Sequence, residues 1–159
     1  MPNILRYEDP AFSLKAIESL FREYHDFLEI DLNFQYFEAE LASLPGKYSP
    51  LQGGQLYLIK EAEAFVGCAA LWQFKAGIAE VKRLYVRPKE QGKGLGKLLV
   101  NTVVEDAKAL GYEQLYLDSL KRLQAAWKLY KGLNFKEIQP YNKNPHDDVY
   151  YMMLDLKDT

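Results

Sequence analysis

The chain has 159 residues, of which 48% are hydrophobic and 26% are charged, and its formal net charge at pH 7 is −2. This length and composition predict a single globular domain over residues 1–159, and the near-neutral charge gives no reason to expect nucleic acid or a membrane surface as a partner. Charged residues interrupt the N-terminus early, and no apolar run approaches the ~18 residues of a membrane-spanning helix, so we expect a cytoplasmic protein.

The first third of the sequence predicts a short strand and two helices. Residues 3–7 form the expected strand, and Ser13 is a suitable N-cap for a helix whose apolar residues recur at helical spacing over residues 17–28. A second helix is predicted over residues 33–43, followed by a loop over residues 44–54.

The middle of the sequence changes from strand patterns to a helical pattern. Strands are predicted over residues 55–60, 64–73 and 79–86, separated by short turns. A helix is then predicted over residues 94–110, and Gly111 is a suitable C-terminal cap.

The last third predicts a strand over residues 114–118, a helix over 123–133, and closing strands over 135–139 and 149–156. Asn134 stands where the chain often needs a positive φ, which asparagine tolerates better than most residues. The order β-α-α-β-β-β-α-β-α-β-β therefore predicts a mixed α/β domain.

Two stretches carry opposite charge. Seven acids accompany one base over residues 18–40, whereas six bases accompany one acid over residues 82–97. Two solvated faces would explain both runs. Alternatively, an anionic ligand lies near the basic run and a cationic ligand near the acidic run, and the charge pattern leaves both interpretations open.

A strand, a glycine-rich turn and a helix in that order predict an anion-binding site. The turn is the stretch Gln91-Gly92-Lys93-Gly94-Leu95-Gly96-Lys97. A helix N-terminus offers unpaired backbone N–H groups and a partial positive charge, and glycines let a phosphate approach the main chain closely. Lys93 and Lys97 add full charges, so we expect a phosphate-bearing ligand here.

Two common phosphate-binding motifs do not fit this turn. A P-loop requires serine or threonine after its lysine, but Lys97 is followed by Leu98. The dinucleotide fingerprint requires glycine at the position of Lys97, and it should open a βαβ unit rather than follow several strands.

The stretch Glu80-Val81-Lys82-Arg83-Leu84-Tyr85-Val86-Arg87-Pro88, followed by the turn, resembles the cofactor-binding motif of the GNAT superfamily of N-acetyltransferases, in its small single-domain bacterial form. Gln91, Gly94 and Gly96 match the pattern Gln/Arg-x-x-Gly-x-Gly/Ala. The likeness covers most of the chain, although the family usually has glycine where Asn134 stands. It implies the acyl-CoA N-acyltransferase fold, in which helices flank a mixed, mostly antiparallel sheet.

The resemblance also implies roles for individual residues. The backbone of Leu84, Tyr85 and Val86 would pair with the pantetheine arm of acetyl-coenzyme A (acetyl-CoA), and Tyr130 would protonate the departing thiolate. A thiol pKa of ~8.5 is close enough to the ~10 of tyrosine for this transfer, although spacing alone favours a core role for Tyr130. The remaining cofactor-binding residues would be those of the turn, whose amides hold the pyrophosphate: Gln91, Gly92, Lys93, Gly94, Leu95, Gly96 and Lys97.

Glu80 is the candidate general base, which would take a proton from the acceptor ammonium directly or through water. Alternatively, Glu80 is a surface carboxylate that forms an ion pair with Lys82 or Arg83 and has no catalytic role. His25 and His146 are better explained as polar surface or turn residues, and no spacing typical of a zinc site occurs, so no metal is expected.

The expected function is the transfer of an acetyl group from acetyl-CoA to a primary amine, most simply that of a small cationic molecule. A peptide or protein amine is an alternative acceptor, and a homodimer is an expected arrangement because many family members pair. A non-catalytic acyl-CoA sensor and a nucleotide-binding protein are the rival interpretations. Aromatic residues of the acidic N-terminal helices would line the acceptor side or simply form core: Phe21, Tyr24, Phe27, Phe34, Tyr36 and Phe37.

Overall fold

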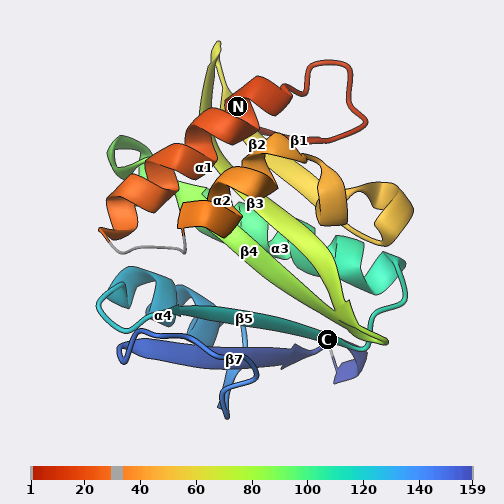
Figure 1. Cartoon of the computed structure of the whole chain (residues 1–159), viewed down its shortest axis with the longest axis vertical. Coiled ribbons are helices and arrows are strands. Elements are labelled where there is room, and N and C mark those ends of the chain that lie inside the picture. The colour runs from red at the N-terminus through yellow and green to blue at the C-terminus, as the bar shows by residue number, and fades with distance from the viewer. Residues whose placement is uncertain (1, 30–33, 159) are drawn as a thin grey trace.

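The computed structural model describes residues 2–29 and 34–158, except for the side chains of residues 34, 35 and 158. Within these ranges every predicted helix and strand is present and in the predicted order (Figure 1). The predicted start of the second helix, Asn33, lies outside the described residues.

Seven strands form one sheet in the order β1-β2-β3-β4-β5-β7-β6. Every neighbouring pair is antiparallel except β4 and β5, which are parallel, so the predicted mixed and mostly antiparallel sheet is confirmed. The strands are β1 (Asn3–Arg6), β2 (Gln55–Glu61), β3 (Ala64–Lys75), β4 (Ile78–Val86), β5 (Gln114–Leu120), β6 (Lys136–Ile138) and β7 (Val149–Asp155), and the helices are α1 (Leu14–Leu28), α2 (Phe34–Ala42), α3 (Leu95–Ala109) and α4 (Gln124–Gly132).

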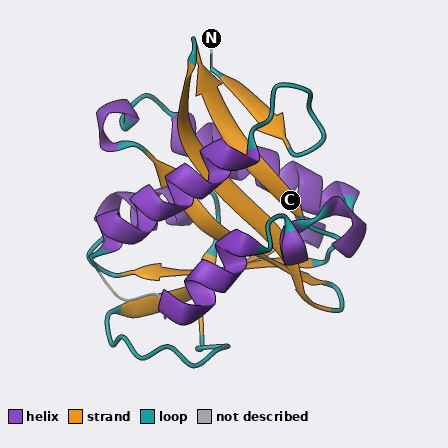
Figure 2. Cartoon of the chain, turned by 45° about the horizontal axis from the view of Figure 1, so that its top comes forward, coloured by secondary structure: helices purple, strands orange, loops and turns teal. Residues whose placement is uncertain are grey.

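Helices cover both faces of this sheet (Figures 1 and 2). Strand side chains alternate between faces, so Leu56 and Leu58 of β2 pack with α1 and α2, whereas Tyr57 and Ile59 pack with α3 and α4. The local signals read from the sequence act as expected: the Ser13 side chain accepts a hydrogen bond from the Ala16 amide at 3.1 Å and caps α1.

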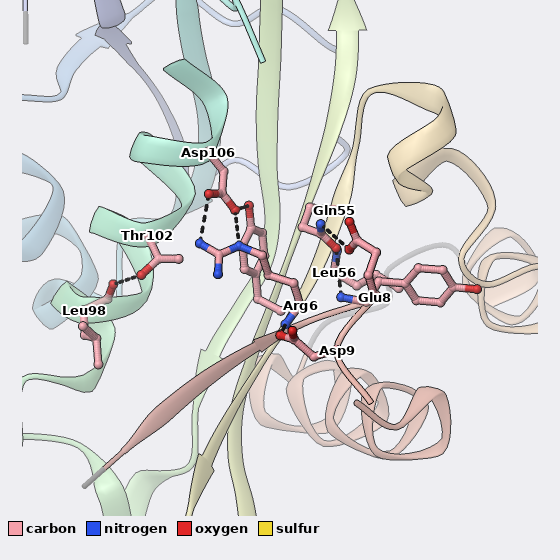
Figure 3. A network of polar contacts seen from close by, with 10 residues as sticks. Arg6, Glu8, Asp9, Gln55, Leu56, Leu98, Thr102 and Asp106 are labelled. Atoms are coloured by element: carbon pink, nitrogen blue, oxygen red, sulfur yellow. Dashed lines mark hydrogen bonds and ion pairs between the residues drawn. The ribbon is translucent and has the colours of Figure 1, made fainter. Parts of the chain in front are cut away.

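A polar network fixes β1 to helix α3. β1 is the edge strand of the sheet that lies farthest from β5. Arg6 donates two hydrogen bonds to Asp106, at 2.8 and 3.0 Å (Figure 3). The Tyr57 hydroxyl donates a third to Asp106 at 2.8 Å. Nearby, Gln55 donates to Glu8 at 2.8 Å. These contacts hold the edge of the sheet in place and take no part in the site described below.

The sheet opens between β4 and β5. The two strands pair only where residues 78–80 face residues 114–116, and beyond that point they separate (Figure 1). The separation coincides with a β-bulge in β4: Cys68 pairs with Tyr85 but Ala70 pairs with Lys82, so β4 carries one extra residue there. Arg83 lies in the bulge with φ 59°, a left-handed conformation that is uncommon for a residue with a side chain.

Candidate functional site

A cavity of about 740 Å³ occupies the opening between β4 and β5. It is bounded by both strands, by the glycine-rich turn, by α1 and α4, and by the segment that joins β6 to β7. The lining comprises residues 81–86, 91, 92, 94–96, 117–120, 122–126, 129, 130, 142–146 and 149, together with residues 24, 27 and 28 of α1.

The glycine-rich turn forms one end of this cavity. Gly92 and Gly94 have φ values of 85° and 81°, in the left-handed region that glycine adopts without strain. A Cβ atom built on either would meet nothing within 4 Å, so the main chain is open toward the cavity. Gln91 fastens the turn to the end of β4, because its side-chain amide donates to the Val86 carbonyl at 2.9 Å.

The backbone amides of the turn are available to a ligand. The Gln91 amide donates to the Pro88 carbonyl and the Leu98 amide to the Gly94 carbonyl. Between them, the amides of residues 92–97 have no backbone partner within the described part of the chain. This cluster of N–H groups at the N-terminus of the 15-residue helix α3 is the arrangement that binds phosphate oxygens.

The two lysines of the turn lie beside the cavity and are not part of its lining. Lys93 forms an ion pair with Glu90 at 2.6 Å, and Lys97 is exposed on the first turn of α3. Both can attract an anion at long range, whereas the turn itself offers its main chain for direct contact.

The end of β4 supplies the wall next to the turn. Leu84 and Val86 pack toward α3, whereas Tyr85 is 7% exposed and points toward α1, where its ring lies 5.8 Å from Tyr24 and 5.7 Å from Phe27. The edge of β4 that faces β5 has no strand partner here. Apart from the Val86 carbonyl, which accepts from the Gln91 side chain, its main-chain groups are open to an extended ligand.

Tyr130 of α4 reaches the cavity from the opposite wall and is only 5% exposed. Its ring lies 5.7 Å from that of Phe135. Phe135 directly follows Asn134, which has the predicted positive φ, 72°. Burial raises the pKa of Tyr130 well above its ordinary value, and negative charge on Tyr24, Tyr150 and Asp118 would raise it further. Tyr130 is therefore a neutral hydroxyl, able to donate a proton.

The structure brings nine of the twelve predicted site residues together around the cavity. Glu80, Lys93 and Lys97 are not among its described lining residues. Those that line it are Leu84, Tyr85, Val86, Gln91, Gly92, Gly94, Leu95, Gly96 and Tyr130.

Glu80 is not the surface carboxylate of the alternative interpretation, because it is only 2% exposed. The Trp72 indole donates to Oε1 at 2.8 Å, and the Tyr141 hydroxyl donates to Oε2. The expected partner Lys82 is present, with Nζ 3.6 Å from Oε1. A catalytic role for Glu80 stays a prediction, and both of its oxygens already have partners.

Asp118 is a residue that the sequence analysis missed. It lies on β5 beyond the point where β4 departs, and it is the one carboxylate among the cavity-lining residues that the structure describes. Asn142 donates to Asp118 Oδ2 at 3.0 Å and accepts a hydrogen bond from the Tyr151 hydroxyl at 2.9 Å. The alternation of side chains along a strand could have placed Asp118 on the opposite face of the sheet from the buried Leu117. It gave no sign that β5 has no strand partner from β4 at this point.

The acidic and basic runs partly neutralise each other. Arg87 forms two hydrogen bonds with Glu23 of α1, at 2.9 and 2.7 Å, and Arg83 forms two with Glu40 of α2, at 3.0 and 3.1 Å. Burial opposes the ionisation of Glu40, but the charge and hydrogen bonds of Arg83 outweigh it, so the pKa of Glu40 lies below its ordinary value. Glu40 supports the bulge through Arg83, and both acids are paired, which leaves less negative charge for a cationic ligand than the sequence suggests.

The aromatic residues of the N-terminal helices divide between cavity and core. Tyr24 and Phe27 line the cavity, and burial raises the pKa of Tyr24 to about 12. Phe21 and Phe37 are core residues, whereas Tyr36 is 71% exposed. The side chain of Phe34 lies outside the described part of the structure.

The two histidines occupy different surroundings. His25 stacks on Phe37, with the ring centroids 4.9 Å apart, and is not part of the cavity lining. His146 lines the cavity from the turn-rich segment before β7, where a turn residue was expected.

Two further kinds of feature are absent from residues 2–29 and 34–158. No group of three or more His, Cys, Asp or Glu side chains there could hold a metal ion. No helix within these ranges is both long and apolar enough to cross a membrane.

Comparison with known proteins identifies the family of this chain. Residues 14–135 match the family model described as "Acetyltransferase (GNAT) family". An uncharacterized N-acetyltransferase of Schizosaccharomyces pombe is 40% identical over 144 residues, which cover 90% of this chain and 88% of that protein.

Solved structures give the same fold at lower identity. A GNAT-family acetyltransferase of Staphylococcus aureus has a TM-score of 0.79 and 20% identity, with 98% of this chain and 99% of that chain covered. A GNAT-family acetyltransferase of Elizabethkingia anophelis, solved with acetyl-CoA bound, has a TM-score of 0.66 and 18% identity, with 97% of each chain covered. These likenesses show the fold that surrounds the cavity.

Proposed function

The chain belongs to the GNAT acetyltransferase family, and on that basis we propose that it transfers the acetyl group of acetyl-CoA directly to a primary amine. One observation carries the proposal. The unpaired edge of β4, the open amides of residues 92–97 and the Tyr130 hydroxyl border the same cavity, and these are the groups that an extended thioester with a pyrophosphate would need.

The residues present fit coenzyme A as the donor. The amides of the turn would hold the pyrophosphate, since the left-handed glycines leave room where a Cβ atom would obstruct it. The main-chain groups of residues 84–86 that lie on the unpaired edge of β4 would pair with the amides of the pantetheine arm. When bound, acetyl-CoA supplies an activated acetyl thioester that an amine can attack with release of the thiol.

Tyr130 would return a proton to the thiol sulfur. Its buried hydroxyl stays protonated at physiological pH, because burial raises its pKa well above the ordinary value. It can therefore donate its proton to the thiolate when the carbon–sulfur bond breaks, and solvent restores the proton afterwards. Because burial widens the gap between its pKa and the ~8.5 of the thiol, this transfer is less favourable than the ordinary tyrosine pKa of ~10 would make it.

Asp118 is our candidate for the group that accepts the proton of the acceptor ammonium. It is the cavity-lining carboxylate of the described chain, and the amide of Asn142 fixes its orientation. Proton removal leaves the amine nitrogen with a free electron pair for attack. Glu80, the base expected from the sequence, would have to act through Tyr141 or a water molecule, because its own oxygens accept hydrogen bonds from Trp72 and Tyr141.

The acceptor would enter between α1 and the segment before β7. Tyr24, Phe27 and Leu28 provide an apolar wall there, and Asp118 provides the negative charge that an ammonium group needs. These features support a small-molecule amine. A peptide amine is the alternative acceptor.

A non-catalytic acyl-CoA sensor is the rival function. It would need the turn and β4 but neither Tyr130 nor Asp118. The test is thiol release from acetyl-CoA with a panel of amines, amino acids, polyamines and peptides, alongside calorimetry with coenzyme A. Acceptor-dependent thiol release supports the transferase. Tight coenzyme A binding without turnover on any acceptor would favour the sensor.

A further inference from the structure

Glu80 is the one charged side chain that is fully buried in the described residues, and its surroundings suggest what it does. Its two oxygens accept hydrogen bonds from Trp72, which pairs with it across β3 and β4, and from Tyr141, which belongs to the segment between β6 and β7. A buried carboxylate is stable only with such partners. Glu80 therefore connects the sheet to a distant part of the chain.

Residues 139–148, which we call the β6–β7 segment, contain neither helix nor strand, yet five of them line the cavity. Two successive residues fasten its first half to the sheet. Tyr141 donates to Glu80, and Asn142 donates to Asp118 at 3.0 Å while it accepts from the Tyr151 hydroxyl at 2.9 Å. The position of Asn142, and with it the hydrogen bond to Asp118, depends on where Tyr141 is held.

Packing and charge both favour the Tyr141 contact. The ring of Tyr141 lies 4.8 Å from Tyr116 and 5.1 Å from Phe74, so it rests on aromatic side chains of β3 and β5. Burial is the main cause that raises the pKa of Tyr141, and the negative charge of Glu80 raises it further. The hydroxyl therefore stays protonated and remains a hydrogen-bond donor.

We propose that Glu80 is a positioning residue for acetyl transfer: it holds Tyr141 and thereby fixes the β6–β7 segment, including Asn142, over the acceptor side of the cavity. The inference rests on the proposed function, and it assigns Glu80 a different task from the general base expected from the sequence. A base must exchange protons with the acceptor. A positioning residue must only keep its two hydrogen bonds.

The two roles predict different kinetic effects for the same pair of variants. If Glu80 acts through Tyr141, Glu80→Gln and Tyr141→Phe weaken the same contact, so each should raise the acceptor KM about 10-fold, as expected for a lost buried hydrogen bond. The acetyl-CoA KM and the pH profile of kcat should stay as in the wild type. The double variant should be no worse than Tyr141→Phe alone, because contacts in one network are not additive. Tyr116→Phe is the matched control: it removes a hydroxyl from the same aromatic group and should leave all three quantities unchanged.

The opposite pattern would overturn the proposal. If Glu80 is the base, Glu80→Gln should lower kcat by about 100-fold or more and abolish its limb of the pH profile, while Tyr141→Phe stays close to wild type. Wild-type kinetics in both single variants would also overturn it.

Hydrogen exchange provides a readout that needs no turnover. Two amides report on the β6–β7 segment: that of His146, which donates to the Asn144 side chain, and that of Lys121, which donates to the Asp148 carbonyl. Both should exchange faster in Glu80→Gln and in Tyr141→Phe than in the wild type or Tyr116→Phe. Unchanged exchange would overturn the proposal even if acetyl transfer is observed. Faster exchange in a protein that transfers no acetyl group would support the anchoring while refuting the proposed function.

Discussion

The two ends of the cavity are built in different ways. The proposed donor end consists of main chain: the unpaired edge of β4 and the amides of residues 92–97, all within one continuous stretch of sequence. The acceptor end consists of side chains from α1, β5, α4 and the β6–β7 segment, which are more than 100 residues apart at the extremes. A backbone site depends on the local conformation of a few glycines, whereas a side-chain site depends on long-range packing.

The largest expected effect concerns the acceptor end. Asp118→Asn keeps the shape of the side chain and an oxygen for Asn142, but it removes the group that accepts a proton. We expect kcat to fall by about 10²- to 10⁴-fold, with little change in the affinity for coenzyme A. Steady-state kinetics and calorimetry would measure the two quantities.

Asp26→Asn is the matched control for this change, since the Asp26 side chain is 84% exposed on α1. It should leave kcat unchanged. Nearly full activity in Asp118→Asn would remove Asp118 from the mechanism and return attention to Glu80 or to a water molecule as base.

The donor end should be sensitive to backbone conformation. Gly94→Leu places a side chain at φ 81° in the turn, which both strains the main chain and obstructs the phosphate position. We expect coenzyme A to bind about 100-fold more weakly, a loss of about 2.7 kcal/mol. Calorimetric titration would measure it.

Gly111→Leu separates strain from obstruction. Gly111 has φ 89° and open space around its Cβ position, but it follows α3 and does not line the cavity. It should lower the thermal stability about as much as Gly94→Leu while leaving the affinity for coenzyme A unchanged. Equal losses of affinity in the two variants would contradict the site assigned to the turn.

A smaller effect is expected where the two ends meet. Tyr130→Phe removes the proton donor to the sulfur but preserves the packing on Phe135, so kcat should fall about 10- to 100-fold. Since the pKa of Tyr130 is raised well above its ordinary value, Tyr130 should contribute no loss of activity between pH 6 and pH 9. A pH–rate profile would test this, with Tyr36→Phe as an exposed control.

The contact that supports the β4 bulge should affect stability. The pKa of Glu40 is lower in the folded protein than its ordinary value, so its ionised form stabilises the fold above the unfolded-state pKa, and that contribution disappears as the pH falls through the folded-state pKa. Glu40→Gln should therefore lower the free energy of unfolding by about 1–3 kcal/mol at pH 7 and by less at pH 4.

Chemical denaturation at the two pH values would measure the effect of Glu40→Gln. Glu38→Gln, which breaks the exposed pair with Arg22, should cost less than Glu40→Gln at pH 7 because solvent screens that pair. A Glu40→Gln loss that is larger at pH 4 than at pH 7 would contradict the role given to the Arg83 pair.

The sequence predicted the donor end more fully than the acceptor end. The order and the type of the helices and strands followed from the spacing of hydrophobic residues and from the turn residues between them. The glycine-rich turn, the Ser13 cap and the left-handed Asn134 followed from the chemistry of individual residues. The left-handed Arg83 could not be foreseen, because no glycine marks the bulge and its conformation is supported by Glu40, 43 residues away. For the same reason, pairing between the acidic and basic runs was not visible in their composition.

The role of Asp118 escaped prediction for a topological reason. On a fully paired strand it would be one polar residue among hydrophobic neighbours. It faces a cavity only because β4 separates from β5 after residue 80, and the β6–β7 segment returns to cover it. Both features arise from tertiary packing, whereas the spacing of hydrophobic residues in a sequence indicates only local secondary structure.

Binding of the donor along β4 and on the turn amides can be followed by amide NMR of the ¹⁵N-labelled protein titrated with coenzyme A. We expect the largest shifts on residues 84–86 and 92–97, and we expect Gly94→Leu to suppress them. Saturable binding with its largest shifts elsewhere, or unchanged shifts in Gly94→Leu, would contradict this mode of binding.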